Sequence, residues 1–242
     1  MNIYEILPIG ERIKGNPYVG RGIVIGKTED GTKSAIAYFI MGRSENSRNR
    51  VFTYKNDVLY TEPFDASKVE DPSLIIYAAV RNHNNQTVVT NGDQTDTIYE
   101  FIKKGDSFEN ALLTREFEPD PPNFTPRISG IVSYNNGDMA YKMSILKSLD
   151  EVGSDCQRFT YNYPSKNGLG HFIHTYITDG NPIPTFCGEP ERIAIPNDID
   201  ELVKDIWENL NENNKISLYV RYTDLKTGEV VDRIINKNGG NE

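Results

Sequence analysis

The sequence is poor in cysteine, and its two cysteines do not form a recognisable site. Cys156 and Cys187 are too few for a disulfide framework and lack the paired spacing of a zinc site. Long hydrophobic runs are missing too, since no stretch approaches the roughly 18 apolar residues that a membrane span needs. The segment 1–5 lacks the basic and then apolar pattern of a secretory signal. We therefore expect a cytoplasmic protein with no membrane association.

Positive charge is also scarce. The chain has 26 Lys and Arg against 35 Asp and Glu, which gives a formal net charge of −9. Nucleic-acid-binding domains are normally basic and gather Lys and Arg on one element. This balance argues against a nucleic-acid partner, whereas an anionic small molecule can still bind where a few arginines converge.

The common sequence motifs of catalytic and cofactor-binding sites are absent as well. The chain contains no GxGxxG, P-loop, GxSxG, HExxH or CxxC motif. His171 and His174 are three residues apart in a predicted strand, so they are expected to point to opposite faces and not to share a metal ion. We interpret His83 and His171 as polar residues at strand edges. The sequence motifs therefore indicate no metal site.

Turn signals and alternating apolar residues predict a chain built mainly of β-hairpins. Asp30-Gly31 and Asn136-Gly137 are dipeptides typical of tight hairpin turns. Helical spacing is confined to 96–115 and 199–212. Because strands and helices come in separate blocks, antiparallel sheets with helices on their outer faces fit better than a parallel sheet. The predicted strands cover 18–25, 33–41, 51–54, 57–61, 74–81, 87–90, 127–134, 139–148, 158–163, 171–176, 215–223 and 229–235.

Three polar clusters stand out from this background. The loop 42–50 holds three arginines, whose guanidinium groups suit phosphate oxygens; the alternative is an exposed basic loop. The turn 90–97 leads into a helix N-terminus that favours an anion, or serves only as a capping box that begins at Thr97. The segment 116–127 places carboxylates before Arg127, either as an acid/base pair with its electrostatic partner or as a surface ion pair.

A fourth segment, 174–190, is an unusually polar loop with two turns that contain proline. An ordinary strand connection would be shorter. We weigh a functional loop and a packed structural loop equally.

Taken together and in this order, these segments resemble the archaeal-type IMP cyclohydrolase family. The resemblance covers roughly 17–135 and weakens in the last hundred residues, where this chain is longer than the compact members. Each string alone is weak, and the ordered set is fairly specific. The matching strings are Tyr18-Val19-Gly20-Arg21-Gly22-Ile23, Gly26-Lys27, Gly42-Arg43-Ser44, Asn49-Arg50, Asp71-Pro72-Ser73 leading to Tyr77, Thr90-Asn91-Gly92, Thr95-Asp96-Thr97-Ile98, Phe117-Glu118 and Thr125-Pro126-Arg127-Ile128.

The resemblance implies a fold of the α+β class. The expected architecture is a four-layer αββα sandwich of two mostly antiparallel sheets, like that of N-terminal nucleophile hydrolases. We expect one domain over 1–242 with a frayed tail at 236–242. The chain starts with Met1-Asn2, without the Thr, Ser or Cys that a true N-terminal nucleophile enzyme exposes at its first residue. An autoprocessed amidohydrolase is therefore disfavoured.

The implied activity is the closure of 5-formamidoimidazole-4-carboxamide ribotide to IMP with loss of water, in purine biosynthesis. This reaction demands no metal and no organic cofactor, so we expect neither. The expected partners are the purine ribonucleotide substrate and product, with no nucleic acid and no membrane, and a homo-oligomer is allowed.

The resemblance also implies roles for individual residues. Arg50 would bind the carboxamide or the developing oxyanion, Tyr77 would donate to the formyl oxygen, and Glu118 would handle the proton on nitrogen. The nucleotide site would be lined by Arg21, Asn91, Thr95, Asp96, Thr97 and Arg127, with Arg43 as a weaker member.

Two other functions stay open at this point. One is a hydrolase of a related purine intermediate that shares the nucleotide site. The other is a nucleotide-binding regulator that keeps the fold without turnover. The joint presence of Arg50, Tyr77 and Glu118 favours the enzyme, because a pure binder needs no acid/base pair.

Overall fold

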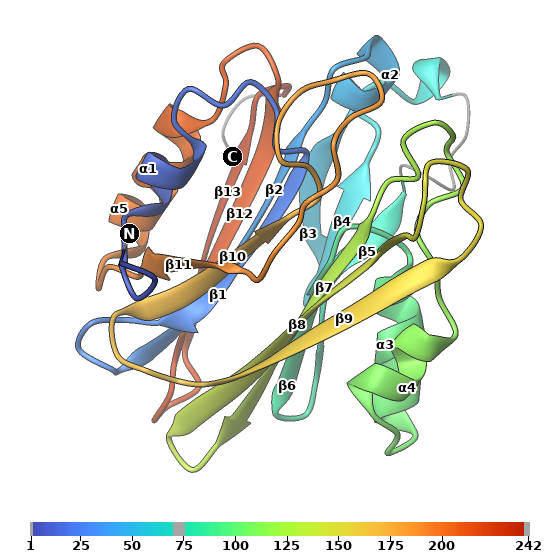
Figure 1. Cartoon of the computed structure of the whole chain (residues 1–242). Helices are drawn as coiled ribbons and strands as arrows, with labels where there is room; N and C mark the ends of the chain where they lie inside the picture. Colours follow the sequence, from blue (N-terminus) through green and yellow to red (C-terminus); the bar gives the residue numbers. More distant parts are fainter. Residues whose placement is uncertain (1, 70–75, 240–242) are drawn as a thin grey trace.

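Two antiparallel β-sheets stacked face to face form the centre of the molecule (Figure 1). The computed structural model describes residues 2–69 and 76–239. Within these residues the first sheet has six strands in the order β11-β10-β1-β2-β12-β13, and the second has seven in the order β3 to β9. All strand pairs within both sheets are antiparallel, as the hairpin signals predict.

The strand bounds follow the turn signals closely. The first sheet contains β1 (Arg21–Lys27), β2 (Lys33–Met41), β10 (Leu169–His174), β11 (Glu191–Ala194), β12 (Lys215–Asp224) and β13 (Val230–Asn236). The second contains β3 (Val51–Lys55), β4 (Val58–Glu62), β5 (Tyr77–His83), β6 (Gln86–Thr90), β7 (Arg127–Asn135), β8 (Asp138–Ser148) and β9 (Cys156–Pro164).

Apolar side chains from both sheets meet in the space between them. Ile23 and Tyr38 of the first sheet pack in one cluster with Val132 and Met143 of the second. These positions are fully buried, and their neighbours along each strand face the opposite way, because side chains alternate across a strand. This inner core holds the two sheets together face to face.

Helices cover the outer faces of both sheets. α1 (Ile9–Ile13) and α5 (Ile199–Asn209) lie on the first sheet, and α3 (Gln94–Lys103) and α4 (Phe108–Leu113) lie on the second (Figure 1). The buried face of α5 carries Ile199, Leu202 and Ile206, which repeat at helical spacing. The predicted four-layer αββα architecture is confirmed. No helix within the described ranges is long and apolar enough to cross a membrane.

The structure corrects one local prediction and adds short elements. α3 begins at Gln94 after Asp93, so Thr97 lies inside the helix and does not cap it. Three further elements are α2 (Glu45–Arg48), a 3-10 turn (Ala66–Lys68) and the helix α1. Together with β11, they are too short for a periodic signal. The string 71–73 and the first two residues of the predicted strand 74–81 lie outside the described residues, as do 240–242 of the tail.

Candidate active site

A cavity of about 330 Å³ opens at the end of the sandwich that carries α2. Its walls come from four stretches of chain that are distant in sequence: the start of β1, the loop after β2, the 118–125 segment and the 176–183 segment. The lining residues are Tyr18, Arg21, Met41, Arg43, Ser44, Asn46, Ser47, Arg50, Glu118, Asp120, Asn123, Thr125, Tyr176 and Ile183.

Three charged side chains in the lining of this cavity are buried, and we call the part of the cavity that they form its closed end. Arg21, Arg50 and Glu118 are each less than one-tenth exposed. Gly20 fixes the entry to β1 with a φ of 77°, where a Cβ would collide with the Thr175 hydroxyl. Burying two guanidinium groups beside one carboxylate is costly unless their donors find partners. The cluster is therefore difficult to explain by packing alone.

Several of these buried donors have no partner in the part of the chain that the structure describes. They are Nε of Arg21, and Nε and Nη1 of Arg50. A buried N–H group without an acceptor costs about 1–3 kcal/mol, so native proteins rarely leave several together. This arrangement indicates that an acceptor supplied by a ligand belongs here.

The buried charges shift one another's pKa values. Burial raises the pKa of Glu118, and the nearby positive charge of Arg21 opposes that shift. Burial lowers the pKa of Arg50, and repulsion from Arg21 adds to the effect. For Arg21 itself burial acts to lower the pKa, but attraction to Glu118 and neighbouring groups outweighs burial and raises it. The result is a buried carboxyl group whose pKa lies above that of an exposed glutamate.

A pair of tyrosine hydroxyls lies next to this cluster. The hydroxyls of Tyr38 on β2 and Tyr77 on β5 are 2.8 Å apart, and both side chains are buried. Burial raises the pKa of Tyr38, while the charges of Arg21 and Arg50 oppose the shift. Tyr77 in turn contributes to the electrostatic environment of both arginines.

The structure thus brings the three predicted catalytic residues into one neighbourhood. Arg50 and Glu118 line the cavity with Arg21, and Tyr77, which is not part of the lining, interacts electrostatically with both arginines. The chain between Arg21 and Glu118 runs through two strands of the first sheet and four of the second. Their predicted roles require this proximity.

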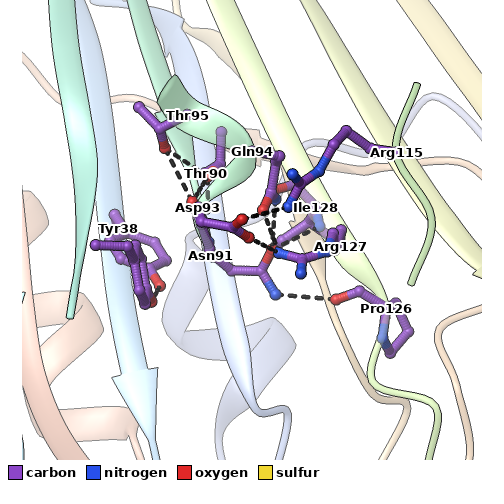
Figure 2. Close-up of polar contacts among 12 residues, drawn as sticks. Tyr38, Thr90, Asn91, Asp93, Gln94, Thr95, Arg115, Pro126, Arg127 and Ile128 are labelled. Carbon is purple, nitrogen blue, oxygen red and sulfur yellow. Dashed lines mark hydrogen bonds and ion pairs between the residues drawn. The ribbon is translucent and has the colours of Figure 1, made fainter. Parts of the chain in front are cut away.

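The predicted nucleotide-binding residues at the β6–α3 junction form a separate hydrogen-bonded cluster (Figure 2). The side-chain oxygen Oδ1 of Asn91 accepts from the backbone N–H of Ile128 at 2.9 Å, and its side-chain nitrogen Nδ2 donates to the Pro126 carbonyl at 2.9 Å. The hydroxyls of Thr95 and Thr90 are 2.6 Å apart. Asn91 and Thr95 thus join the end of β6 to the start of β7 and α3.

Arg127 belongs to this cluster and is not part of the cavity lining; it lines a separate hollow together with Arg115. Its Nη1 donates to Asp93 at 2.7 Å and to Gln94 at 2.8 Å, and Asp93 also accepts from Arg115 (Figure 2). Its positive charge acts to lower the pKa of Glu118. Arg127 is therefore the member of the junction that is coupled electrostatically to the cavity.

Two other predicted binding residues lie apart from the cavity lining. Asp96 is exposed on α3 and accepts from Nη1 of Arg81 on β5 at 2.6 Å. Thr97 is half-buried one residue further along the same helix. Contact of these two residues with a nucleotide stays a prediction.

Several residues of the cavity were not predicted as site residues. Tyr18 and Thr125 stand in the matching strings, so the resemblance could have identified them. Tyr176 belongs to the fourth polar segment, and its hydroxyl is 2.6 Å from that of Thr125. Tyr38 is not part of the cavity lining, but its hydroxyl bonds to that of Tyr77. It had no signal in the sequence, because it is one aromatic residue within an apolar strand.

The structure also corrects the interpretation of one histidine. His171 is buried, with Nδ1 2.6 Å from the Tyr141 hydroxyl and its ring stacked on Tyr163 at 3.7 Å. Burial lowers its pKa to about 4, so it is a neutral core residue and not a polar edge residue. His174 stacks on Phe172, a residue of the core between the first sheet and its helices.

Replacing Asn91 with Ala is expected to lower the free energy of unfolding by about 1–3 kcal/mol, because the Ile128 N–H loses its buried acceptor. Denaturant unfolding measures the change. Asn162→Ala, on the exposed surface of β9, is the matched control and should stay within about 0.5 kcal/mol of wild type. Equal stability of the two variants would show that Asn91 does not stabilise the junction.

Comparison with known proteins gives a consistent result. The profile of a family described as IMP cyclohydrolase-like protein matches residues 18–228. The IMP cyclohydrolase of Methanococcus aeolicus is 30% identical over 163 residues, which cover 66% of this chain and 74% of that protein. The IMP cyclohydrolase of Haloquadratum walsbyi is 26% identical over 226 residues, covering 90% and 98%. An IMP cyclohydrolase of Methanococcus maripaludis is 34% identical over 129 residues, which cover 51% of this chain and 62% of that protein.

Proposed function

Since this chain belongs to the IMP cyclohydrolase-like protein family, we propose that it is an IMP cyclohydrolase. It closes 5-formamidoimidazole-4-carboxamide ribotide to IMP and releases water. The observation that carries the proposal is the set of guanidinium N–H groups of Arg21 and Arg50 that find no partner among the described residues, beside Glu118 at the closed end of the cavity. Its partners are purine ribonucleotides, and it acts in the cytoplasm.

The reaction joins two poor reactants within one molecule. The carboxamide nitrogen attacks the formyl carbon, and a C–N bond forms while the formyl oxygen gains negative charge. Holding the two groups face to face removes much of the entropic barrier. The free N–H groups of Arg50 stabilise the oxyanion, as positioned donors do in other acyl-group reactions.

The proton transfers fall to Glu118 and Tyr77. The Glu118 carboxylate accepts the proton that leaves the attacking nitrogen. Tyr77 donates a hydrogen bond to the formyl oxygen. That oxygen takes up the proton held by Glu118 and a second proton from the former formamide nitrogen, and it departs as water as the C=N double bond of the ring forms. This role of Tyr77 requires the Tyr38 hydroxyl, 2.8 Å away, to be the donor to the Tyr77 oxygen, so that the Tyr77 proton points to the substrate.

The shape of the cavity suggests how the ribotide lies in it. The reacting groups need the closed end, where water is excluded and electrostatic interactions are strong. The phosphate is the most strongly hydrated group, so its desolvation costs least at the mouth. The mouth offers Arg43 together with the Ser44 hydroxyl as donors. Participation of Asn91, Thr95 and Arg127 in binding also stays a prediction.

Replacing Arg21 with Gln is expected to move the acid limb of the pH–kcat/KM profile to higher pH. Arg21 stabilises the Glu118 carboxylate, so its removal raises the pKa of Glu118 further. A larger share of the enzyme is then protonated and inactive at a given acidic pH. The profile of Lys68→Gln, which removes an exposed positive charge, should match wild type. If the acid limb of Arg21→Gln lies at the same pH as that of wild type, protonation of Glu118 is not the cause of the limb.

The proposed function is tested by incubating the purified protein with the formamido ribotide and following the absorbance of IMP. An IMP cyclohydrolase accumulates IMP, and an Arg50→Met variant loses that activity. A hydrolase of a related intermediate would release formate and the amino ribotide instead. A regulator without turnover would bind IMP and leave the substrate unchanged.

A further inference from the structure

The polar 174–190 segment forms a hairpin at the mouth of the cavity. Ile177 N–H donates to the Pro184 carbonyl at 2.8 Å, and Tyr176 and Thr185 form an antiparallel bridge. We call residues 177–184 the mouth hairpin. This segment lies outside the stretch with the strongest family resemblance, and the mechanism above gives it no role.

The mouth hairpin is attached to both sides of the cavity. On one side the Ile183 N–H donates to Oδ1 of Asn123 at 3.1 Å, and the Ile183 side chain lines the cavity. On the other side Arg43, in the loop after β2, donates from Nη1 to Oδ1 of Asp179 at 2.5 Å and to the Gly180 carbonyl at 2.8 Å. The hairpin therefore reaches across the mouth.

These contacts fix the orientation of the Arg43 guanidinium group. Its central carbon also lies 5.3 Å from the centre of the Tyr18 ring, in a cation–π contact. Within the described residues, the hydrogen bonds of Arg43 all leave from Nη1. The edge formed by Nε and Nη2 is thus free, and such an edge matches two oxygens of a phosphate.

We propose that Asp179 is a positioning residue that holds Arg43 at the mouth, so that the free edge of Arg43 binds the 5′-phosphate of the ribotide. The mouth hairpin thereby makes the enzyme select phosphorylated nucleotides over nucleosides. This inference rests on the proposed function, because it assumes that a ribotide occupies the cavity.

The donors at the mouth favour the binding of a phosphate group over that of an uncharged sugar. The exposed Ser44 adds a hydroxyl donor next to Arg43, because its oxygen accepts from the Ser47 N–H and keeps its own proton for a ligand, whereas the Ser47 hydroxyl already donates to the Ser44 carbonyl. Asp179 occupies the Nη1 side of the guanidinium group and leaves the other edge open, so it orients Arg43 without competing for that edge. Without Asp179 the long Arg43 side chain would have to be immobilised when the ligand binds, at a cost in affinity.

The test measures equilibrium binding of IMP and of inosine, which lacks the phosphate, by calorimetry. We compare wild type with Asp179→Ala, Asp179→Asn, Arg43→Met and the double variant Arg43→Met/Asp179→Ala. Asp138→Ala is the matched control, because Asp138 is also an exposed carboxylate paired with a basic side chain, Lys27 at 2.8 Å. Thermal unfolding establishes that each variant is folded.

We expect Asp179→Ala to weaken IMP binding about tenfold and inosine binding less than twofold, with the same selective loss in the shape-preserving Asp179→Asn. Arg43→Met should lose more, and the double variant should lose no more than Arg43→Met alone, because Asp179 acts through Arg43. Equal losses for IMP and inosine, or additive losses in the double variant, would overturn the proposal.

Failure of this inference is distinct from failure of the proposed function. A wild-type protein that binds IMP more tightly than inosine and yet makes no IMP contradicts the enzyme activity and leaves the phosphate site standing. A wild-type protein that makes IMP but binds IMP and inosine equally contradicts the phosphate site alone.

Discussion

Replacing Tyr77 with Phe is expected to lower kcat by about 10²–10³ while KM stays close to its wild-type value. The substitution keeps the ring in its buried position and removes only the hydroxyl. That hydroxyl assists the formyl oxygen as its charge develops, so its loss weakens the transition state more than the bound substrate. Steady-state kinetics with the formamido ribotide measure both constants.

The matched control for this variant is Tyr141→Phe. Tyr141 is also a buried tyrosine with one hydroxyl partner, Nδ1 of His171 at 2.6 Å, but it belongs to a different cavity, which it lines together with Tyr163. The Tyr141→Phe substitution should lower the free energy of unfolding without a comparable fall in kcat. A Tyr77→Phe enzyme with the wild-type rate would remove Tyr77 from the mechanism.

Replacing Glu118 with Gln is expected to lower kcat by about 10²–10⁴, because the amide cannot accept the proton from the attacking nitrogen. The wild-type profile of kcat/KM should fall as the pH drops through the pKa of Glu118, since only the carboxylate is active. Burial raises that pKa, so the acid limb lies above the ordinary range of a glutamate. In the Gln variant this limb should disappear from the residual activity.

Glu109→Gln controls for the loss of a carboxylate elsewhere. Glu109 is paired with Lys142 on the surface of α4, away from the cavity. Its kinetics and pH profile should match those of wild type. If Glu118→Gln keeps the full rate and the same acid limb, another group performs the proton transfer.

Local sequence signals predicted most of the fold. The hairpin around Asn136-Gly137 was predicted within a residue at each inner strand end, because the dipeptide favours the positive φ values that a tight turn needs. α1 and β11 were missed for the opposite reason. They are short, and the bridge beside them joins Leu7 to Ile193, a contact that has no local signature.

The residues of the candidate site also differ in whether the sequence carries a signal for them. The resemblance to a family predicted roles for Arg50, Tyr77 and Glu118 because their strings follow one another in a recognisable order. It could not identify Asp179, since the pairing with Arg43 joins positions 136 residues apart and depends on how one hairpin folds over the cavity. Nor did it predict that Asp96 turns to Arg81, because a helix surface offers several neighbouring partners.

The proposed catalytic group is divided between the two sheets. Arg21 and Tyr38 stand on strands of the first sheet, whereas Tyr77 stands on the second and Arg50 directly precedes its strand β3. The Tyr38–Tyr77 hydrogen bond crosses the interface between them. Neither sheet alone can therefore assemble the site, and catalytic activity becomes a direct readout of sheet-to-sheet spacing. A substitution in the inner core that only widens this spacing, far from any substrate atom, would misalign the donors as effectively as the loss of one of them.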